Sequence, residues 1–269
     1  MVSTIIQTFA NLIEEIRDTR PLIHHITNSV SINDCANVTL AIGAAPVMAE
    51  ALEEVEEMVS RADALALNIG TLSRSQVDAM LKAGRAANTC DIPIVLDPVG
   101  AGATSFRTES ARLLMDRLDI AVLKGNVGEI GVLAGAGGRV RGVDSHGLDG
   151  DPLLVAQGYA AHAGVTVVVS GAHDVVTDGS RTVVVDNGHA MMGALSGTGC
   201  MATSLTAAFA AIWPDRVLSS ATALAAFGIA GERAAQSASG PYSFRMALVD
   251  EIAHLHRRDL LHQAKIRSV

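Results

Sequence analysis

The sequence predicts an α/β fold in which helices cover both faces of a mostly parallel sheet. Short runs rich in β-branched residues alternate with longer stretches of helical periodicity, which is the pattern of strands joined by crossover helices. Hydrophobic residues make up 49% of the 269 residues but aromatic residues only 3%, so the core must be built from small aliphatic side chains. Such a core suits helices packed closely on a sheet that is buried on both sides. We expect residues 1–269 to form one domain, because no linker composition interrupts them.

Five short apolar runs are the expected strands of the parallel part of the sheet: Leu22–Ile26, Ala64–Asn68, Ile92–Leu96, Ile120–Leu123 and Val165–Val169. The helical stretches between them are Asn33–Ile42, Glu53–Arg61, Arg74–Ala87, Glu109–Leu118, Val127–Leu133 and Pro152–Ala163. Ser73 precedes Gln76 by three residues, the spacing of a capping box, which predicts the start of the third helix.

The first strand contains two adjacent histidines, and we expect one of His24 and His25 to pack in the core and the other to face outward. The segment before this strand, residues 1–21, predicts an amphipathic helix, since it lacks the basic start and continuous apolar block of a signal peptide. The most apolar later stretch, residues 199–230, is interrupted by Pro214 and does not predict a membrane span.

The alternation of strands and helices stops at one edge of the expected sheet. Asp174–Thr177 and Arg181–Asp186 flank an Asp178-Gly179 pair, which readily takes the positive φ angles of a tight turn and predicts an antiparallel hairpin. From Thr198 onward we expect three helical stretches and no further strand.

Charge and cysteine content narrow the class of protein. A net charge of -8, without a cluster of basic and aromatic residues, argues against nucleic-acid binding and against acidic membranes. The three cysteines have spacings that fit neither a disulfide framework nor a zinc site, so we expect a reducing cytoplasm. An acidic protein that binds a polyanion must do so locally, with backbone N–H groups, one or two basic side chains and a divalent cation.

Polar and glycine-rich segments follow the ends of the expected strands. In a parallel sheet covered by helices, the ligand-binding crevice lies beyond the carboxyl ends of the strands. These strand-end segments are Thr27-Asn28, Asn68-Ile69-Gly70-Thr71, Asp97-Pro98-Val99-Gly100-Ala101-Gly102, Lys124-Gly125-Asn126 and Ser170-Gly171. They predict one site.

The segment Ser196-Gly197-Thr198-Gly199-Cys200 opens a helix of small residues. Its glycines allow a ligand to approach the backbone, and the free N–H groups of the helix start could hold a phosphoryl group in transfer. The alternative is a turn that serves tight packing alone. Cys200 stands in the first turn, where thiol pKa values are often lowered; it could contact or deprotonate an alcohol, or be a small buried residue.

Two carboxylates are candidates for holding Mg²⁺: Asp97 at the end of a strand, and Glu129, which follows Lys124-Gly125-Asn126 at the start of a helix. Glu129 could instead be only a favourable charge at a helix start, and Asp97 only a cap. Lys124 is a candidate phosphate contact, with a solvated surface lysine as the alternative. No GxxxxGK[ST] loop is present, which excludes a P-loop kinase at the level of motifs.

Taken together, the motifs of this sequence resemble those of hydroxyethylthiazole kinase, a thiamine-salvage family with the ribokinase-like fold. The resemblance runs in order from about Pro21 to Phe244. It rests on HHITNSVSINDCANVTLAIGAAPVMAEALEEVEEM, ALALNIGTL, PIVLDPVGAGATSFRTE, LKGNVGEI, GVDS, VVVSGAHDVVTDG, NGHAMM and SGTGCMATSLTAAFAA.

The resemblance implies a single ribokinase-like domain that uses ATP and Mg²⁺ to phosphorylate the primary alcohol of 4-methyl-5-(2-hydroxyethyl)thiazole. It also implies a homotrimer with active sites close to subunit boundaries. Carried over by position, Met48, Asn28 and Gly70 would bind the thiazole. Lys124, Asn126 and Ser170 would contact ATP, at positions where arginine and threonine are also expected for Lys124 and Ser170. Asp97 and Glu129 would serve the metal, and Gly197 would touch the substrate beside Thr198, Gly199 and Cys200.

The wider fold carries an aspartate base where this chain has Cys200. A thiol is mostly neutral at pH 7, so proton removal is expected to count for little beside positioning and charge stabilisation. A thioether such as that of Met48 packs well against a small aromatic ring. The alternatives are a kinase of the same fold acting on hydroxymethylpyrimidine, a sugar or another small alcohol, a dehydratase that repairs hydrated nicotinamide cofactors, and a binding protein without catalysis.

Overall fold

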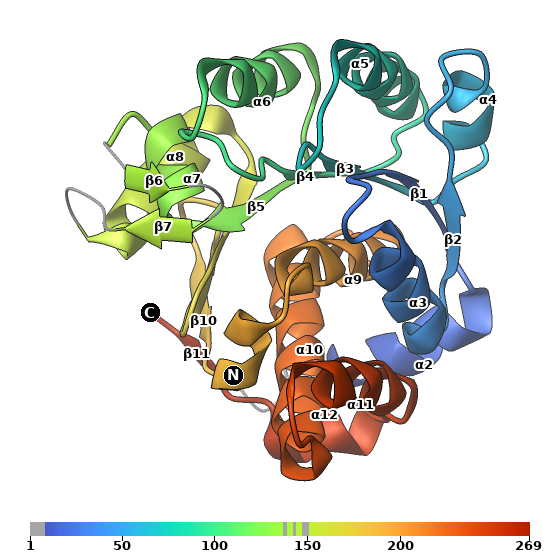
Figure 1. Ribbon diagram of the computed structural model, residues 1–269, viewed down its shortest axis with the longest axis vertical. Coiled ribbons are helices and arrows are strands. Elements are labelled where there is room, and N and C mark those ends of the chain that lie inside the picture. The colour runs from blue at the N-terminus through green and yellow to red at the C-terminus, as the bar shows by residue number, and fades with distance from the viewer. Residues whose placement is uncertain (1–8, 137–138, 142–143, 147–150) are drawn as a thin grey trace.

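The computed structural model describes residues 9–136, 139–141, 144–146 and 151–269, which form three layers, with a sheet between two sets of helices (Figure 1). The strands of the central sheet are β1 (Leu22–Ile26), β2 (Ala45–Met48), β3 (Ala64–Asn68), β4 (Ile94–Asp97), β5 (Val122–Asn126), β8 (Thr166–Ser170), β9 (Asp174–Thr177), β10 (Thr182–Val185) and β11 (Ile266–Ser268). Within the described residues they make a nine-stranded sheet in the order β11-β10-β9-β8-β5-β4-β3-β1-β2. Strands β2, β1, β3, β4, β5 and β8 are parallel, and β9, β10 and β11 are antiparallel, which confirms the expected fold class.

Helices cover both faces of this sheet (Figure 1). One face carries α4 (Val55–Val59), α5 (Arg74–Thr89), α6 (Ser105–Arg117), α7 (Val127–Leu133) and α8 (Pro152–Ala163). The other carries α2 (Leu12–Thr19), α3 (Ile32–Ile42), α9 (Thr198–Ile212), α10 (Arg216–Ser237), α11 (Pro241–Ala253) and α12 (Arg257–Gln263). A short ribbon of β6 (Arg139–Arg141) and β7 (Asp144–His146) lies outside the central sheet, next to α7, and a 3-10 turn, η1 (Ala190–Ala194), precedes α9. Among the described helices, none combines the length and the apolar character that a membrane crossing requires.

Alternate residues of each strand face the two helical layers. In β3, Ala64 and Ala66 pack on the side of α9, whereas Leu65 and Leu67 pack on the side of α5. Both faces are therefore apolar, which explains why the strands appear in the sequence as continuous apolar runs. For the same reason the expectation of an outward-facing histidine is wrong, because His24 and His25 are both buried.

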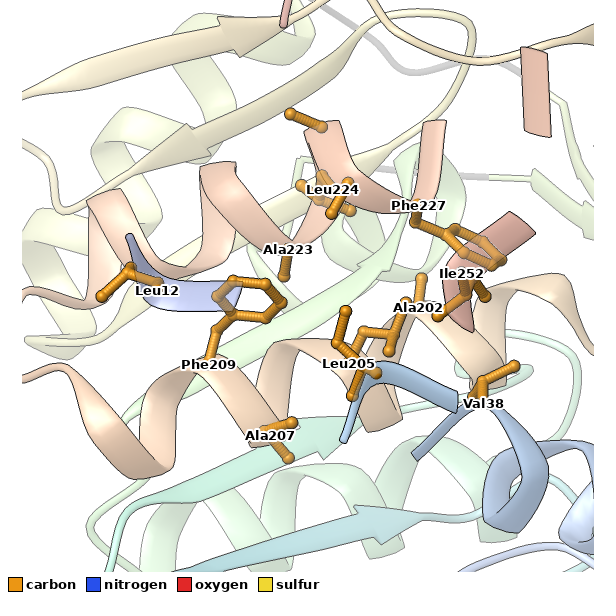
Figure 2. Packing of buried hydrophobic residues seen from close by; sticks show 14 of the residues in the cluster. Leu12, Val38, Ala202, Leu205, Ala207, Phe209, Ala223, Leu224, Phe227 and Ile252 are labelled. Atoms are coloured by element: carbon orange, nitrogen blue, oxygen red, sulfur yellow. The ribbon is translucent and has the colours of Figure 1, made fainter. Parts of the chain in front are cut away.

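Helix α9 lies directly on β1, β3 and β4, and α10 packs over it. Figure 2 shows Leu205 and Phe209 of α9 between the two helices, with Ala207 pointing the other way toward the strands. Small side chains such as Ala207 let the helix approach the sheet closely. This packing brings the first turn of α9 to the carboxyl ends of the central strands.

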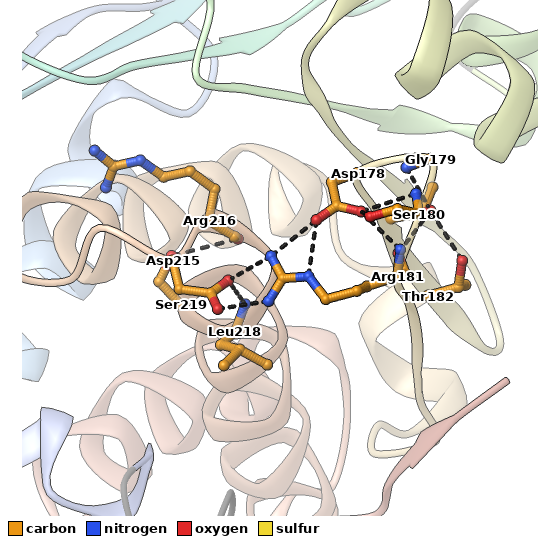
Figure 3. Close-up of polar contacts among 10 residues, drawn as sticks. Asp178, Gly179, Ser180, Arg181, Thr182, Asp215, Arg216, Leu218 and Ser219 are labelled. Atoms are coloured by element: carbon orange, nitrogen blue, oxygen red, sulfur yellow. Dashed lines mark hydrogen bonds and ion pairs between the residues drawn. The ribbon is translucent and has the colours of Figure 1, made fainter.

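The expected hairpin is confirmed as β9 and β10, joined through Gly179 at a φ of +89°. Figure 3 shows how Arg181 ties this turn to the start of α10: its guanidinium donates to Asp178 and, through two nitrogens, to Asp215. Asp215 in turn caps α10 by accepting from the N–H of Leu218 at 3.2 Å.

Several expected boundaries need correction. The structure contains β2, whose Pro46 suits an edge strand because proline cannot donate to a sheet. The expectation of three helical stretches and no strand after Thr198 is wrong: four helices follow in the described chain, and β11 then pairs with β10. Helix α6 begins at Ser105 and not at Glu109, since the Thr104 hydroxyl accepts from the N–H of Arg107. The Ser73 cap is confirmed by the bond from the N–H of Gln76.

Of the expected helix over residues 1–21, the described part contains α2, and residues 1–8 lie outside it.

Candidate functional site

Two cavities meet at the carboxyl ends of the parallel strands. The first, here called the Cys200 cavity, has a volume of about 590 Å³ and is lined by Cys200, Asn28, Gly70, Asp97 and Glu129 among others. The second, the Phe227 cavity, has a volume of about 530 Å³ and lies between the β8–β9 connection and α10. Five residues line both cavities and mark their junction: Lys124, Ser170, Gly193, Thr198 and Gly199. Residues from all five strand-end segments therefore lie around these two cavities.

The first turn of α9 presents free backbone donors at this junction. In the part of the chain that the structure describes, no acceptor bonds the N–H groups of Thr198, Gly199 and Cys200. The turn requires glycine at 197, where φ is +90° and a Cβ atom would lie 2.9 Å from the Cβ atom of Ser31. Free N–H groups at a helix start, with the positive end of the helix dipole, bind anions.

Lys124 is the main cation of the junction. Its side chain is 1% exposed, so the alternative of a solvated surface lysine does not apply. Within the described chain its ammonium makes no hydrogen bond and no ion pair, and a Cβ atom at Gly199 would lie 3.8 Å from Nζ. The Nζ atom opens to the cavities, so an anion bound between Lys124 and the α9 turn would be stabilised by both.

Asp97 and Glu129 place two buried carboxylates in the Cys200 cavity. Burial raises the pKa of Asp97, although the nearby Lys124 opposes the shift. Burial and the charge of Asp97 raise the pKa of Glu129 to about 7. Two carboxylates that disfavour each other's ionised form are relieved by a cation placed near both.

The hydrogen bonds of these carboxylates bear on metal binding. Asp97 accepts bonds at Oδ2 from Asn68 (2.9 Å) and Thr203 (2.7 Å), and no described residue donates to its Oδ1. Glu129 accepts from the N–H groups of Gly100 (2.7 Å) and Asn126 (2.8 Å), so it also takes part in the capping box of α7. The described residues contain no group of three or more potential metal ligands. Mg²⁺ is commonly held by one or two carboxylates with phosphate and water completing its shell, and these residues fit that role.

Cys200 lies beside these carboxylates. Its sulfur accepts hydrogen bonds from the side-chain amides of Asn28 and Asn68, each at 3.2 Å. Burial and then the negative charge of Asp97 raise the pKa of the thiol, which corrects the expectation that its place in the first helical turn would lower it. The thiol is therefore neutral near pH 7.

The Phe227 cavity combines an apolar wall with polar ends. Leu224 and Phe227 of α10 form the wall, and Gly228 lets the chain at Asn187 pass close by, since a Cβ atom there would lie 2.5 Å from the Cβ atom of Asn187. At the other end Asp174 accepts from the N–H of Gly171 at 2.9 Å, and burial raises the pKa of Asp174 to about 6. A mostly apolar hollow with a few polar groups suits a planar ring such as a nucleobase.

Most predicted site residues lie at these cavities. Asn28, Gly70 and Asn126 line the Cys200 cavity, whereas Met48 is half-buried on β2 and lines neither cavity of this chain. The polar atoms of Asn28 are engaged with the protein, for its Oδ1 accepts from Val30 and Ser31.

Sequence reasoning assigned no role to Asn68, Thr203, Asp174 or Arg107. The Arg107 guanidinium donates to the carbonyls of Ile69, Val99 and Gly70 and so joins two loops of the site. Asn68 lies in one of the strand-end segments, and this position could have identified it as a site residue. The other three carry no such signal, because their partners are distant in the sequence or lie in loops.

Comparison with known proteins gives consistent matches. Residues 13–258 match the model of the hydroxyethylthiazole kinase family. A hydroxyethylthiazole kinase of Methanosphaerula palustris is 63% identical over 258 residues, which is 96% of this chain and 97% of that protein. The solved structure of a hydroxyethylthiazole kinase protein from Pyrococcus horikoshii is 41% identical, with a TM-score of 0.89 over 97% of this chain and 99% of that one. A ribokinase-like superfamily protein from Enterococcus faecalis, 15% identical, has a TM-score of 0.64 over 92% of this chain and 95% of that one, which confirms the ribokinase-like fold.

Proposed function

Because the chain belongs to the hydroxyethylthiazole kinase family, we propose that it transfers the terminal phosphoryl group of ATP to the primary alcohol of 4-methyl-5-(2-hydroxyethyl)thiazole, in thiamine salvage. Residues 1–269 act as one kinase domain. The observation that carries the proposal is the junction of the two cavities, where a buried lysine without hydrogen bonds faces the free N–H groups of a helix start.

Each of the two substrates occupies one of the two cavities. The nucleotide occupies the Phe227 cavity, with its base against Leu224 and Phe227 and its phosphates reaching Ser170 and Lys124. The thiazole alcohol occupies the Cys200 cavity beside Gly197, Asn28 and Gly70. The terminal phosphoryl group then crosses at the residues that both cavities share. A shared junction holds donor and acceptor close together, which lowers the entropic part of the barrier.

Charge stabilisation at the junction comes from groups that are already in place. The N–H groups of Thr198, Gly199 and Cys200 and the ammonium of Lys124 donate to the oxygens of the transferring group, so little reorganisation is needed. Mg²⁺, held by Asp97 and Glu129, would neutralise phosphate charge when bound. Asn126 positions Glu129 through a reciprocal cap, in which its Oδ1 accepts from the N–H of Glu129 at 2.9 Å.

Cys200 contributes position more than basicity. Its raised pKa leaves a neutral thiol, and its sulfur already accepts two N–H groups. The alcohol proton therefore leaves late in the transfer, when the oxygen has become acidic through bonding to phosphorus.

We also propose that the protein acts as a cytoplasmic homotrimer in which a neighbouring copy completes the thiazole pocket. Val30 lines the Cys200 cavity although its side chain is 69% exposed, and Ile32 and Leu52 are exposed around an adjacent cavity of about 570 Å³. Met48, on the edge strand β2, would contact substrate in this assembly. Light scattering measures the mass in solution, and a fully active monomer would contradict the assembly.

The proposed activity is tested with purified protein, ATP and Mg²⁺ against a panel of alcohols. The thiazole alcohol should consume ATP and yield a phosphate monoester that is identified by mass and by phosphorus NMR. Hydroxymethylpyrimidine and a sugar should react far more slowly. Preference for either of these would assign a different kinase of the same fold, and ligand binding without turnover would assign a binding protein.

A further inference from the structure

Asn68, at the end of β3, is the residue through which several groups of the site are joined. Its Nδ2 donates to Asp97 Oδ2 at 2.9 Å and to Cys200 Sγ at 3.2 Å. Its Oδ1 accepts from Asn28 Nδ2 at 2.9 Å and from the N–H of Gly70 at 2.9 Å. The side chain is 2% exposed and does not line the Cys200 cavity. It therefore acts on the cavity through other residues.

The orientation of this amide is set by the backbone. Because a main-chain N–H can only donate, the N–H of Gly70 requires an oxygen at the position of Asn68 Oδ1. The N–H groups of Val30 and Ser31 set the orientation of Asn28 in the same way. Both Nδ2 groups must then face Cys200 as donors, and the sulfur lies between two N–H groups whose direction cannot be exchanged.

The bond to Asp97 has a separate consequence. Asn68 and Thr203 both donate to Oδ2, which leaves Oδ1 without a donor in the described chain. A carboxylate held by two donors at one oxygen has its other oxygen directed by that same pair.

From these contacts we propose that Asn68 is a positioning residue of the phosphoryl-transfer site. Its side chain fixes the positions of the Asp97 and Cys200 side chains relative to each other. It directs the free oxygen of Asp97 to the cation, and it engages the lone pairs of Cys200 so that the thiol contacts the acceptor without competing for its proton. This inference rests on the proposed kinase function and deepens it.

Two substitutions test the inference. Asn68→Asp keeps the shape of the side chain and its acceptors for Gly70 and Asn28, but it loses both donations. Asn68→Ala loses all four bonds and adds no charge. In each we expect kcat to fall about tenfold to a hundredfold, which is the usual effect of losing hydrogen bonds to charged groups. The Mg²⁺ concentration for half-maximal rate should rise, with a smaller change in KM for the thiazole.

A second readout follows Cys200 itself. Iodoacetamide should alkylate Cys200 about threefold more slowly, or slower still, in both Asn68 variants, because an N–H donor that favours the thiolate is gone. This is measured with Cys90→Ser as the starting protein, since Cys90 is exposed and would react first. Thr203→Val removes the other donor to Asp97 and should raise the Mg²⁺ requirement while leaving the alkylation rate unchanged.

Asn88→Ala is the matched control. The Asn88 amide also bridges two segments, through bonds with the backbone of Asp119 at 2.9 Å, but at the opposite end of the sheet. It should leave both readouts at the level of the unaltered protein. The inference is overturned if folded Asn68 variants keep kcat within about twofold, or if their alkylation rate equals that of the parent. If the unaltered protein does not phosphorylate the thiazole, the proposed function fails, while the alkylation rates still decide whether Asn68 holds Cys200.

Discussion

The glycine turn at the start of α9, which we propose binds the transferring phosphoryl group, leads to a prediction for Gly197→Ala. At a φ of +90°, a side chain of any kind costs about 1–2 kcal/mol. In addition, the new Cβ atom would lie 2.9 Å from the Cβ atom of Ser31, closer than two such atoms can approach, so the turn must shift away from Ser31. That movement displaces the N–H groups of Thr198 and Gly199 from the transferring phosphoryl group.

The two effects differ in what they change. Backbone strain of about 1–2 kcal/mol should lower Tm by roughly 2–8 °C in a protein of this size. Displacement of the donors should lower kcat about tenfold to a hundredfold, since an error of 1 Å costs about a hundredfold. Gly197→Val should abolish turnover, because a larger side chain fills the space of the anion.

Gly164→Ala separates strain from displacement. Gly164 has a φ of +67°, nothing lies within 4 Å of the position of its Cβ atom, and it ends α8 away from the two cavities. It should show a similar loss of Tm with unchanged kcat. Thermal unfolding and steady-state kinetics of the three variants provide the comparison. A near-normal rate in Gly197→Ala and Gly197→Val would remove the α9 turn from the mechanism.

Three further predictions concern single charges. Lys124→Met should lower kcat roughly a hundredfold to a thousandfold, as loss of one fixed donor at a transition state does, and Lys124→Arg should retain part of the rate; equal rates in all three proteins would contradict a phosphate contact. Cys200→Asp should retain or raise phosphorylation, as expected of a position that acts at most as a weak base; complete loss in a folded variant would show a specific role for the thiol. The pKa of Asp174 is raised from 3.8 to about 6 in the folded state, because the folded protein disfavours the ionised carboxylate. Asp174 therefore contributes most to the free energy of unfolding below pH 3.8, and this contribution is lost as the pH rises to about 6. Asp174→Asn should therefore become more stable relative to the unaltered protein as the pH rises from about 4 to 6 in urea unfolding, and a parallel pH dependence of the two would refute this sign.

Local sequence patterns predicted much of the fold. The bounds of α7 and α8 agree with prediction, and a capping residue, Asn126 or Asp151, marks the start of each helix. Gly179 marks the hairpin turn for a similar reason. Strand β11 escaped prediction, since Ile266–Ser268 is short and pairs with β10 from a distant part of the chain. Strand β2 escaped because Pro46 weakens the local signal of a strand.

The candidate site divides in the same way. The sequence by itself determined which groups stand at the ends of the strands and where a glycine turn opens a helix, because these depend on neighbouring residues. The tertiary structure alone decided that Lys124 is buried without hydrogen bonds, that the pKa of Cys200 is raised and not lowered, and that Asn68 joins Cys200 to Asp97. Burial and electrostatic fields are set by side chains that lie far apart along the chain and meet only when the helices close over the sheet.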